Sequence, residues 1–257
     1  MKKEDLTKYE EISKKFKNKI IRLSDFTLLL EEKIVGTKNT QKCYKITHEL
    51  KNKGHLLSIK KDILFITDPQ DPKSEEEIEE LFYWKIVKEH CQKFCGSHYY
   101  IGGLTALELH SQGTGIGIPE EIHIINKHKQ SVEIVMFDKR INFKTLESRK
   151  KNLYPLLSKF TQKIRIKGNA ISHANLELAV LDVLYANSLS NQGYIEGLIK
   201  KLLKKNKKAF SIEQIEQILK QGKYNSSANK LLSLLKEVNG EKADQLEQII
   251  KKHGYLL

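Results

Sequence analysis

The sequence predicts an α+β fold: an N-terminal winged helix-turn-helix, followed by a mixed α/β domain with a helical C-terminal part. Three observations predict it. Two helical segments and two short β-type segments follow one another between Ile20 and Thr67. Strand-like and helical segments are mixed between residues 75 and 190. From Tyr194 onward, apolar residues recur at helical spacing.

The clearest boundary along the chain is the stretch Asp68–Ser74. Two prolines within an acidic stretch that lacks apolar residues continue neither a strand nor a helix. We therefore expect a winged-helix domain at 1–67, a linker at 68–74, an α+β effector domain at 75–190 and a helical subdomain at 191–257.

The N-terminal segment carries the signals of a helix-turn-helix with a hairpin. A hydrophobic edge leads to a first helix that we expect Ser24 to cap. Asn39 or Thr40 opens a second helix, which stops at Gly54. Two β-type runs follow, His55–Ile59 and Ile63–Thr67, joined by Lys60, Lys61 and Asp62. This order is typical of proteins that place the second helix in the major groove of DNA and the hairpin beside it.

The polar face of the second helix is the expected DNA-reading surface. We expect it to face away from Tyr44, Ile46 and Leu50. Side chains in the first half of such a helix reach base edges, whereas flanking lysines contact phosphates. The residues expected at base edges are Thr40, Gln41, Lys42, Lys45 and His48, and those expected at phosphates are Lys51, Lys53, Lys60 and Lys61. The alternative is an ordinary amphipathic helix with a solvated lysine face.

Charge is distributed unevenly along the chain, whose formal net charge is +13. Residues 1–67 hold 16 Lys/Arg against 9 Asp/Glu, whereas residues 68–100 hold 4 against 8. Basic segments around an acidic joint indicate a polyanionic partner, and the excess of lysine over arginine favours phosphate attraction. A second basic cluster consists of Lys200, Lys201, Lys204, Lys205, Lys207 and Lys208. A lysine-rich composition without any partner explains the charge outside residues 1–67 equally well.

The α+β part begins with a helix. Ser74 precedes three glutamates, which suits a helix N-terminus and its dipole, and the helix is expected to run to about Phe94. Its expected apolar face contains Ile78, Leu81, Phe82, Ile86 and Val87. Later strands are expected at Tyr99–Ile101, Glu121–Ile125, Val132–Phe137 and Lys163–Ile166, and helices at Gly103–Leu109 and Leu176–Leu184.

Three signals divide the C-terminal helices. Ser211 with Gln214 forms a capping box that opens one helix. Asn239 and Gly240 interrupt the next apolar stripe, and Gly254 is the expected stop of the last helix.

Two arrangements of residues in the sequence are candidate sites of chemistry. Glycines such as Gly102 and Gly103 at a strand-to-helix turn let backbone amides approach a phosphate, but a nucleotidyltransferase also needs two or three carboxylates for Mg²⁺. The next strand offers Glu121 and, where a second acid is wanted, His123, so tight packing is the favoured explanation of the glycines. The second arrangement, His90, Cys91, Cys95 and His98, has thiols one helical turn apart, which is atypical of zinc sites. We expect no catalytic residue, no metal and no cofactor.

Composition also limits where the protein acts. Three cysteines are too few for a disulfide framework and suit a reducing cytoplasm. We expect neither an export signal nor a membrane span, because no stretch is apolar enough.

Three stretches carry a resemblance to a known family. They are the segment 20–67, the run Tyr99–His110 with the strand Ile122–Ile125 after it, and the run Ile171–Tyr185. The chain resembles the AbiEi family, the antitoxins of AbiE-type (type IV) toxin–antitoxin systems. The residues within the antitoxin-domain pattern are Tyr100, Gly102, Gly103, Leu107, His110, Glu177 and Asp182. The tail after Asn191, with its lysine cluster, does not match the family.

The resemblance implies a non-enzymatic, DNA-binding autorepressor that recognises an inverted repeat in double-stranded DNA upstream of its own operon. It also implies an antitoxin that counteracts a nucleotidyltransferase-like toxin encoded nearby, without forming a stable complex with it. Two alternatives stay open: a nucleotidyltransferase-like enzyme that uses the Gly102-Gly103 turn, and a winged-helix module that binds another protein.

Overall fold

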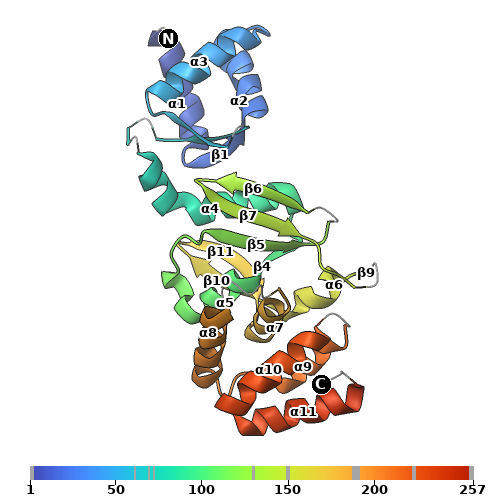
Figure 1. Ribbon diagram of the computed structural model, residues 1–257. Coiled ribbons are helices and arrows are strands. Elements are labelled where there is room, and N and C mark those ends of the chain that lie inside the picture. Colours follow the sequence, from blue (N-terminus) through green and yellow to red (C-terminus); the bar gives the residue numbers. More distant parts are fainter. Residues whose placement is uncertain are drawn as a thin grey trace. The chain divides into compact units, whose positions relative to one another are not determined.

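The computed structural model describes residues 3–60, 62–68, 70–71, 73–128, 131–148, 151–186, 192–221 and 224–254. It is a mixed α/β structure with several sheets. The chain divides into two compact units, residues 1–93 with 135–138, and residues 94–134 with 139–257 (Figure 1). The expected limits of separately folding domains at 67, 74 and 190 stay a prediction.

The first unit is built on a three-stranded antiparallel sheet of order β1-β3-β2. Its elements are α1 (Lys3–Phe16), β1 (Lys19–Arg22), α2 (Leu23–Leu30) with a π-helical turn (Glu31–Val35), α3 (Thr40–Asn52), β2 (Leu56–Lys60), β3 (Ile63–Ile66) and α4 (Glu75–Cys95). Leu56 pairs with Ile66, and Ile21 pairs with Leu64, so β3 lies between the other two strands.

Both faces of this sheet are covered. On one face, side chains from α1, α2 and α3 form a core with Ile21, Leu64 and Ile66. The helical part of that core includes Tyr9, Ile12, Phe26, Leu30, Cys43, Ile46 and Leu50. On the other face lies α4, whose Phe82 ring is 5.2 Å from that of Phe65. Because β3 is buried on both faces, all of its residues are apolar.

Local signals in this unit are confirmed in part. Asn39 is the N-cap of α3, and its side chain accepts a hydrogen bond from the backbone N–H of Lys42 at 3.0 Å. Gly54, with φ of 71°, follows the end of α3 as predicted. The Ser24 cap was wrong: α2 begins at Leu23, and the Ser24 hydroxyl donates to Asp25 instead. The helix α1 was not predicted.

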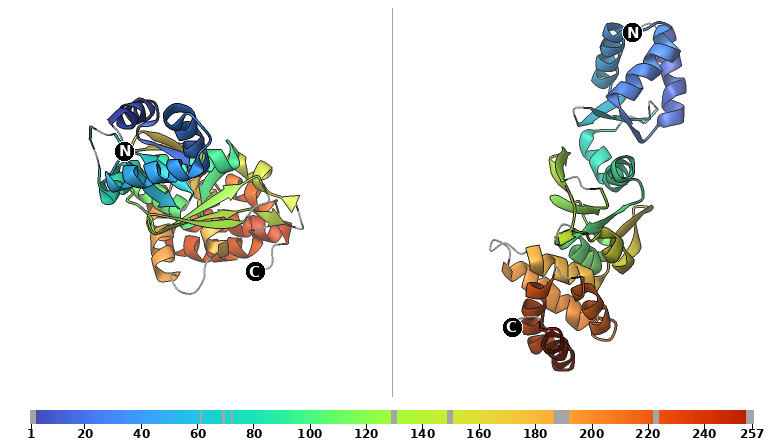
Figure 2. Two further views of the ribbon diagram at one scale, coloured as in Figure 1. Left: turned by 90° about the horizontal axis from the view of Figure 1, so that it is seen from above. Right: turned by 90° about the vertical axis from the view of Figure 1, so that its right-hand side faces the viewer.

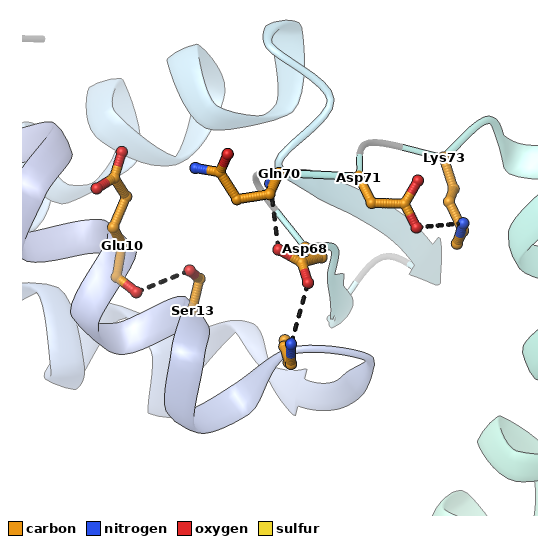
Figure 3. Close-up of polar contacts among 7 residues, drawn as sticks. Glu10, Ser13, Asp68, Gln70, Asp71 and Lys73 are labelled. Atoms are coloured by element: carbon orange, nitrogen blue, oxygen red, sulfur yellow. Dashed lines mark hydrogen bonds and ion pairs between the residues drawn. The ribbon is translucent and has the colours of Figure 1, made fainter.

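Polar contacts order the chain between β3 and α4 (Figure 3). The backbone N–H of Gln70 donates to Asp68, which also pairs with Lys17 at 3.1 Å. Pro69 and Pro72, on which the linker prediction rests, lie outside the described residues. Ser74 and Glu77 then form a reciprocal capping box, so the predicted start of α4 is confirmed.

The apolar face predicted for α4 needs one correction. Ile78, Ile86 and Val87 are buried as expected, but Leu81 is 47% exposed. Trp84 and Tyr83 are buried instead. The helix is therefore covered on more than one side, and a single stripe does not describe it.

A six-stranded mixed sheet has the order β10-β11-β4-β5-β7-β6 and belongs to the second unit, except for the end of β6 from Val135 onward, which is part of the first. Its strands are β4 (Tyr99–Gly102), β5 (Glu121–Asn126), β6 (Val132–Met136), β7 (Lys139–Lys144), β10 (Thr161–Ile166) and β11 (Asn169–Ala174). The pairs β11/β4 and β5/β7 are parallel, whereas β10/β11 and β4/β5 are antiparallel. A small ribbon is formed by β8 (Glu147–Ser148) and β9 (Lys151–Asn152). The strands β7 and β11 were not predicted.

Helices surround a central buried helix in this unit. They are α5 (Gly103–Gln112), α6 (Tyr154–Leu157), α7 (Leu176–Ala186), α8 (Gln192–Lys205), α9 (Ile212–Leu219), α10 (Asn225–Val238) and α11 (Gly240–His253). Every residue of α7 from Leu176 to Leu184 is buried. This helix contacts α5, α9 and α10, and α10 packs beside α11 (Figure 2).

The predicted signals of the C-terminal helices are largely confirmed. Ser211 is the N-cap of α9, Asn239 is the N-cap of α11, and Gly254 ends α11 in a left-handed conformation. No helix in the described part of the chain is long and apolar enough to cross a membrane.

Candidate functional site

The outer face of α3 presents the residues that the sequence predicted at base edges. Thr40, Gln41, Lys42, Lys45 and His48 are all exposed. The opposite face is fixed to the core of the unit by Cys43, Ile46 and Leu50, which are buried. The helix is therefore amphipathic, and its polar side chains point to solvent.

Tyr44 corrects the prediction for this helix. We expected it on the core side, but it is 53% exposed. Gln41, Tyr44, Lys45 and His48 are spaced i, i+3, i+4 and i+7, which places them on one helical face. Sequence reasoning missed Tyr44 because an aromatic residue was assigned to the core by type and not by spacing.

A hollow of about 590 Å³ adjoins this face in the same unit. Its lining includes Thr40 and Tyr44 of α3 and Leu28 of α2, which is 62% exposed. Two cationic side chains, Arg22 and Lys38, and two acidic ones, Glu31 and Asp62, also line it.

The side chains of this face make few contacts with one another. The Thr40 hydroxyl donates to Glu31 at 3.5 Å, and the Asn52 amide lies 3.2 Å from Nδ1 of His48. Within the described residues, none of the ion pairs involves Lys42 or Lys45. Their charges thus remain available to an external anion.

The lysines predicted at phosphates are in different settings. Lys53 is exposed just after α3, and Lys51 is partly buried. Lys60 ends β2 and is partly buried, and Lys61 lies outside the described residues. Burial lowers the pKa of His90 on α4, the charge of Lys60 lowers it as well, and the resulting pKa is about 4. Lys60 therefore lies near α4 as well as at the hairpin tip.

In the second unit, Gly102 and Gly103 are in close contact with side chains. A Cβ at Gly103 would lie 2.9 Å from Nδ1 of His123, and Gly103 has φ of 60°. A Cβ at Gly102 would lie 2.9 Å from Ile125 and 3.1 Å from Asp182. Glycine is needed here so that these side chains can approach the backbone, which agrees with the packing explanation.

His123 belongs to a polar network on β5 and β7. Its Nε2 lies 2.9 Å from Oε1 of Glu121, which also accepts a hydrogen bond from Asn142. Burial lowers the pKa of His123, and the charge of Lys144 lowers it further, whereas Glu121 raises it. Burial raises the pKa of Glu121, but His123 and Asn142 outweigh it and the net shift is downward.

The remaining residues of the antitoxin-domain pattern are buried or hydrogen-bonded within the fold. The Tyr100 ring stacks on Tyr154 with centroids 5.9 Å apart, and Leu107 is fully buried. Nε2 of His110 lies 3.0 Å from the carbonyl oxygen of Ala174.

Two carboxyl groups of the same pattern lie on α7. Glu177 accepts a hydrogen bond from the backbone N–H of Ser211 at 2.8 Å. Asp182 accepts one from the hydroxyl of Tyr224. Together, these residues connect the sheet, α7 and the C-terminal helices.

Two further features of the sequence remain, the cysteine and histidine set and the lysine cluster. Cys91 and Cys95 are buried thiols, and no group of three or more His, Cys, Asp or Glu that could hold a metal occurs among the described residues. In the lysine cluster, Lys200 pairs with Glu237 at 2.7 Å. The exposed members of the cluster are Lys201, Lys204, Lys205, Lys207 and Lys208.

Comparison with protein-family models and with curated proteins gives no match for this chain. Among solved structures, the fold is similar to the crystal structure of RV2827C protein from Mycobacterium tuberculosis. The TM-score is 0.65 with 12% sequence identity, over 96% of this chain and 81% of that chain. At this identity the likeness concerns the fold alone.

Proposed function

We propose that the first unit is a winged helix that binds double-stranded DNA through α3. The observation that carries this proposal is the outer face of α3, where Gln41, Tyr44, Lys45 and His48 are exposed together on a helix anchored by its opposite face. An antiparallel β2–β3 hairpin follows this helix. A recognition helix and an adjacent hairpin bind a duplex in this way.

We further propose that the protein is a transcriptional autorepressor and antitoxin of the AbiEi type. This part rests on the resemblance of the three sequence stretches to that family. Its DNA target is then an inverted repeat upstream of its own operon, and its functional partner is a nucleotidyltransferase-like toxin, counteracted without a stable complex. The protein acts in the cytoplasm and is not an enzyme.

The DNA-binding part is tested by fluorescence anisotropy with the duplex upstream of the gene and a scrambled duplex, across a salt series. We expect tighter binding to the native duplex and a steep loss of affinity with salt, because phosphate contacts release counterions. Replacing Lys51 and Lys53 by Ala lowers the salt slope by about 2 on both duplexes. Replacing the exposed Lys163 and Lys201 of the second unit is the matched control and leaves the slope unchanged.

Equal and salt-insensitive binding to both duplexes contradicts DNA recognition and favours a protein-interaction module. The antitoxin part needs a separate test, because it can fail while DNA binding holds. A nucleotidyltransferase-like toxin, if the adjacent genes encode one as the proposal requires, is expressed with and without this protein, and we expect growth to be restored without co-purification of the two chains. Failure to restore growth removes the antitoxin assignment and leaves the repressor.

A further inference from the structure

A second cavity, of about 570 Å³, lies wholly within the second unit. Its walls come from β5 and β7, from the segment around Val132, and from the end of α7. Its size is within the range of small-molecule sites. Neither DNA binding by α3 nor the antitoxin proposal uses this cavity.

One part of the lining is apolar and aromatic. Ile125, Phe143 and Leu146 contribute apolar surface, and Tyr185 contributes a ring that is 49% exposed. The Tyr185 ring is held edge-on by Tyr224, with centroids 5.7 Å apart. A supported aromatic ring beside apolar walls suits a flat heterocycle, which gains binding energy by stacking.

The polar part of the lining contains hydrogen-bond acceptors next to this apolar surface. Asp182 contributes a carboxyl group, and Asn142 an amide whose nitrogen donates to Glu121. The amide oxygen of Asn142 and the carboxyl oxygens of Asp182 accept hydrogen bonds, as does whichever ring nitrogen of His123 lacks a proton. A heterocycle with an amino group provides the donors that complement them.

The rim of the cavity adds two opposite charges, those of Lys144 and Glu133, and hydroxyl groups. Lys144 is exposed there, and its charge influences His123 inside. Ser131 and Thr145 also line the cavity. A lysine with neighbouring hydroxyls is a common setting for a phosphate.

We propose that this cavity binds a nucleoside monophosphate whose base carries an amino group. The base stacks on Tyr185 and donates to Asp182 and Asn142, and the phosphate lies near Lys144. Binding is a recognition event with no bond formed or broken.

Isothermal titration calorimetry on the full chain in buffer with EDTA tests the proposal. The probes are AMP, GMP, CMP, UMP, adenosine and ribose 5-phosphate. We expect the three amino-bearing nucleotides to bind with a Kd of about 1 mM or tighter, and UMP to bind about tenfold more weakly, because it leaves an acceptor unpaired. The variant Tyr185→Ala weakens binding about tenfold through lost stacking, whereas Tyr194→Ala, equally exposed in the same unit but outside the cavity, has no effect.

A second pair of variants locates the phosphate. Lys144→Gln reduces the advantage of AMP over adenosine, whereas the exposed Lys163→Gln, outside the cavity, preserves it. Circular dichroism confirms that all variants are folded. The proposal is overturned if no nucleotide binds, if Tyr185→Ala leaves affinity unchanged, or if ribose 5-phosphate binds as well as AMP.

Discussion

Glu177 on α7 accepts a hydrogen bond from the backbone N–H of Ser211, the N-cap of α9, at 2.8 Å. In a capping box this N–H is bonded by the residue three positions on, which is Gln214. Here Gln214 accepts from Asn175 instead, at 2.6 Å. A carboxyl group 34 residues away thus completes the cap and fixes α9 against α7.

Two substitutions of Glu177 separate the effect of its hydrogen bond on stability from the effect of its charge. Glu177→Ala leaves a partly buried N–H without an acceptor, and we expect a loss of about 1–3 kcal/mol in the free energy of unfolding. Glu177→Gln retains an acceptor oxygen, so it is expected to lose less. Urea-induced unfolding at pH 7 measures both, and equal losses in the two variants contradict the role of the hydrogen bond.

The pH dependence of Glu177 gives an independent check. Burial raises the pKa of Glu177 above its ordinary value, so the folded state binds the proton more tightly than the unfolded state. Its contribution to stability is fully present below the ordinary pKa and is lost as pH rises through the raised pKa. The stability of the wild type relative to Glu177→Gln is therefore expected to fall from pH 4 to pH 7. A rise over that range contradicts a raised pKa of Glu177.

Gly103→Ala tests the close contact with His123. The substitution imposes a positive φ on alanine and places Cβ 2.9 Å from the His123 ring. We expect a loss of more than about 1 kcal/mol in stability. Gly117→Ala is the control, because nothing lies within 4 Å of a Cβ there. Thermal unfolding compares the two, and a neutral Gly103→Ala means that the contact relaxes without cost.

Tyr44→Ala tests whether this tyrosine reads DNA. If it touches bases between Gln41 and Lys45, its removal lowers affinity for the native duplex by about 1–3 kcal/mol and changes affinity for the scrambled duplex less. Anisotropy on both duplexes measures the difference. Tyr194→Ala, with the same exposed fraction in the second unit, is the control. Equal losses of affinity on both duplexes mean that Tyr44 contacts the DNA backbone. An unchanged affinity means that Tyr44 is not in the interface.

Glu216→Gln is expected to change how the stability of the C-terminal helices depends on pH in acid. Hydrogen bonds from His253 and Lys220 lower the pKa of Glu216 to about 2. Because this pKa is depressed, the contribution of Glu216 to stability is present above the ordinary value of about 4.5 and is lost as pH falls toward 2. The difference in the free energy of unfolding between the wild type and Glu216→Gln should therefore vanish as pH falls from about 4.5 to about 2. Glu241→Gln, on the exposed face of α11, should follow the wild type throughout.

Much of the local structure was predictable because its causes are local. Asn39, Ser74 and Gly54 act on backbone groups within a few residues, so their roles can be read from neighbouring positions. Ser24 shows the limit of such reasoning. It has the right residue type, but the chain enters α2 from β1, and the N-cap is Arg22, two residues earlier.

The misses share a cause in long-range packing. Tyr44 and Leu81 have apolar surface, yet the elements around them cover other faces of their helices. The strands β7 and β11 are polar on one side, and they become strands by pairing with β5 and β4. The contact of His123 with Gly103 likewise joins β5 to the start of α5, and residue spacing does not reveal it.

The sequence by itself determined where α3, α4 and α11 begin and end, how the charge is distributed and which residues of α3 are polar. These properties follow from residue type and from interactions within about one helical turn. Only the tertiary structure decided which face of α3 is open, which strands pair, and that Tyr185, Asp182 and Lys144 line one cavity. Those outcomes depend on contacts between residues far apart in the chain, whose net energy is settled only when the whole core packs.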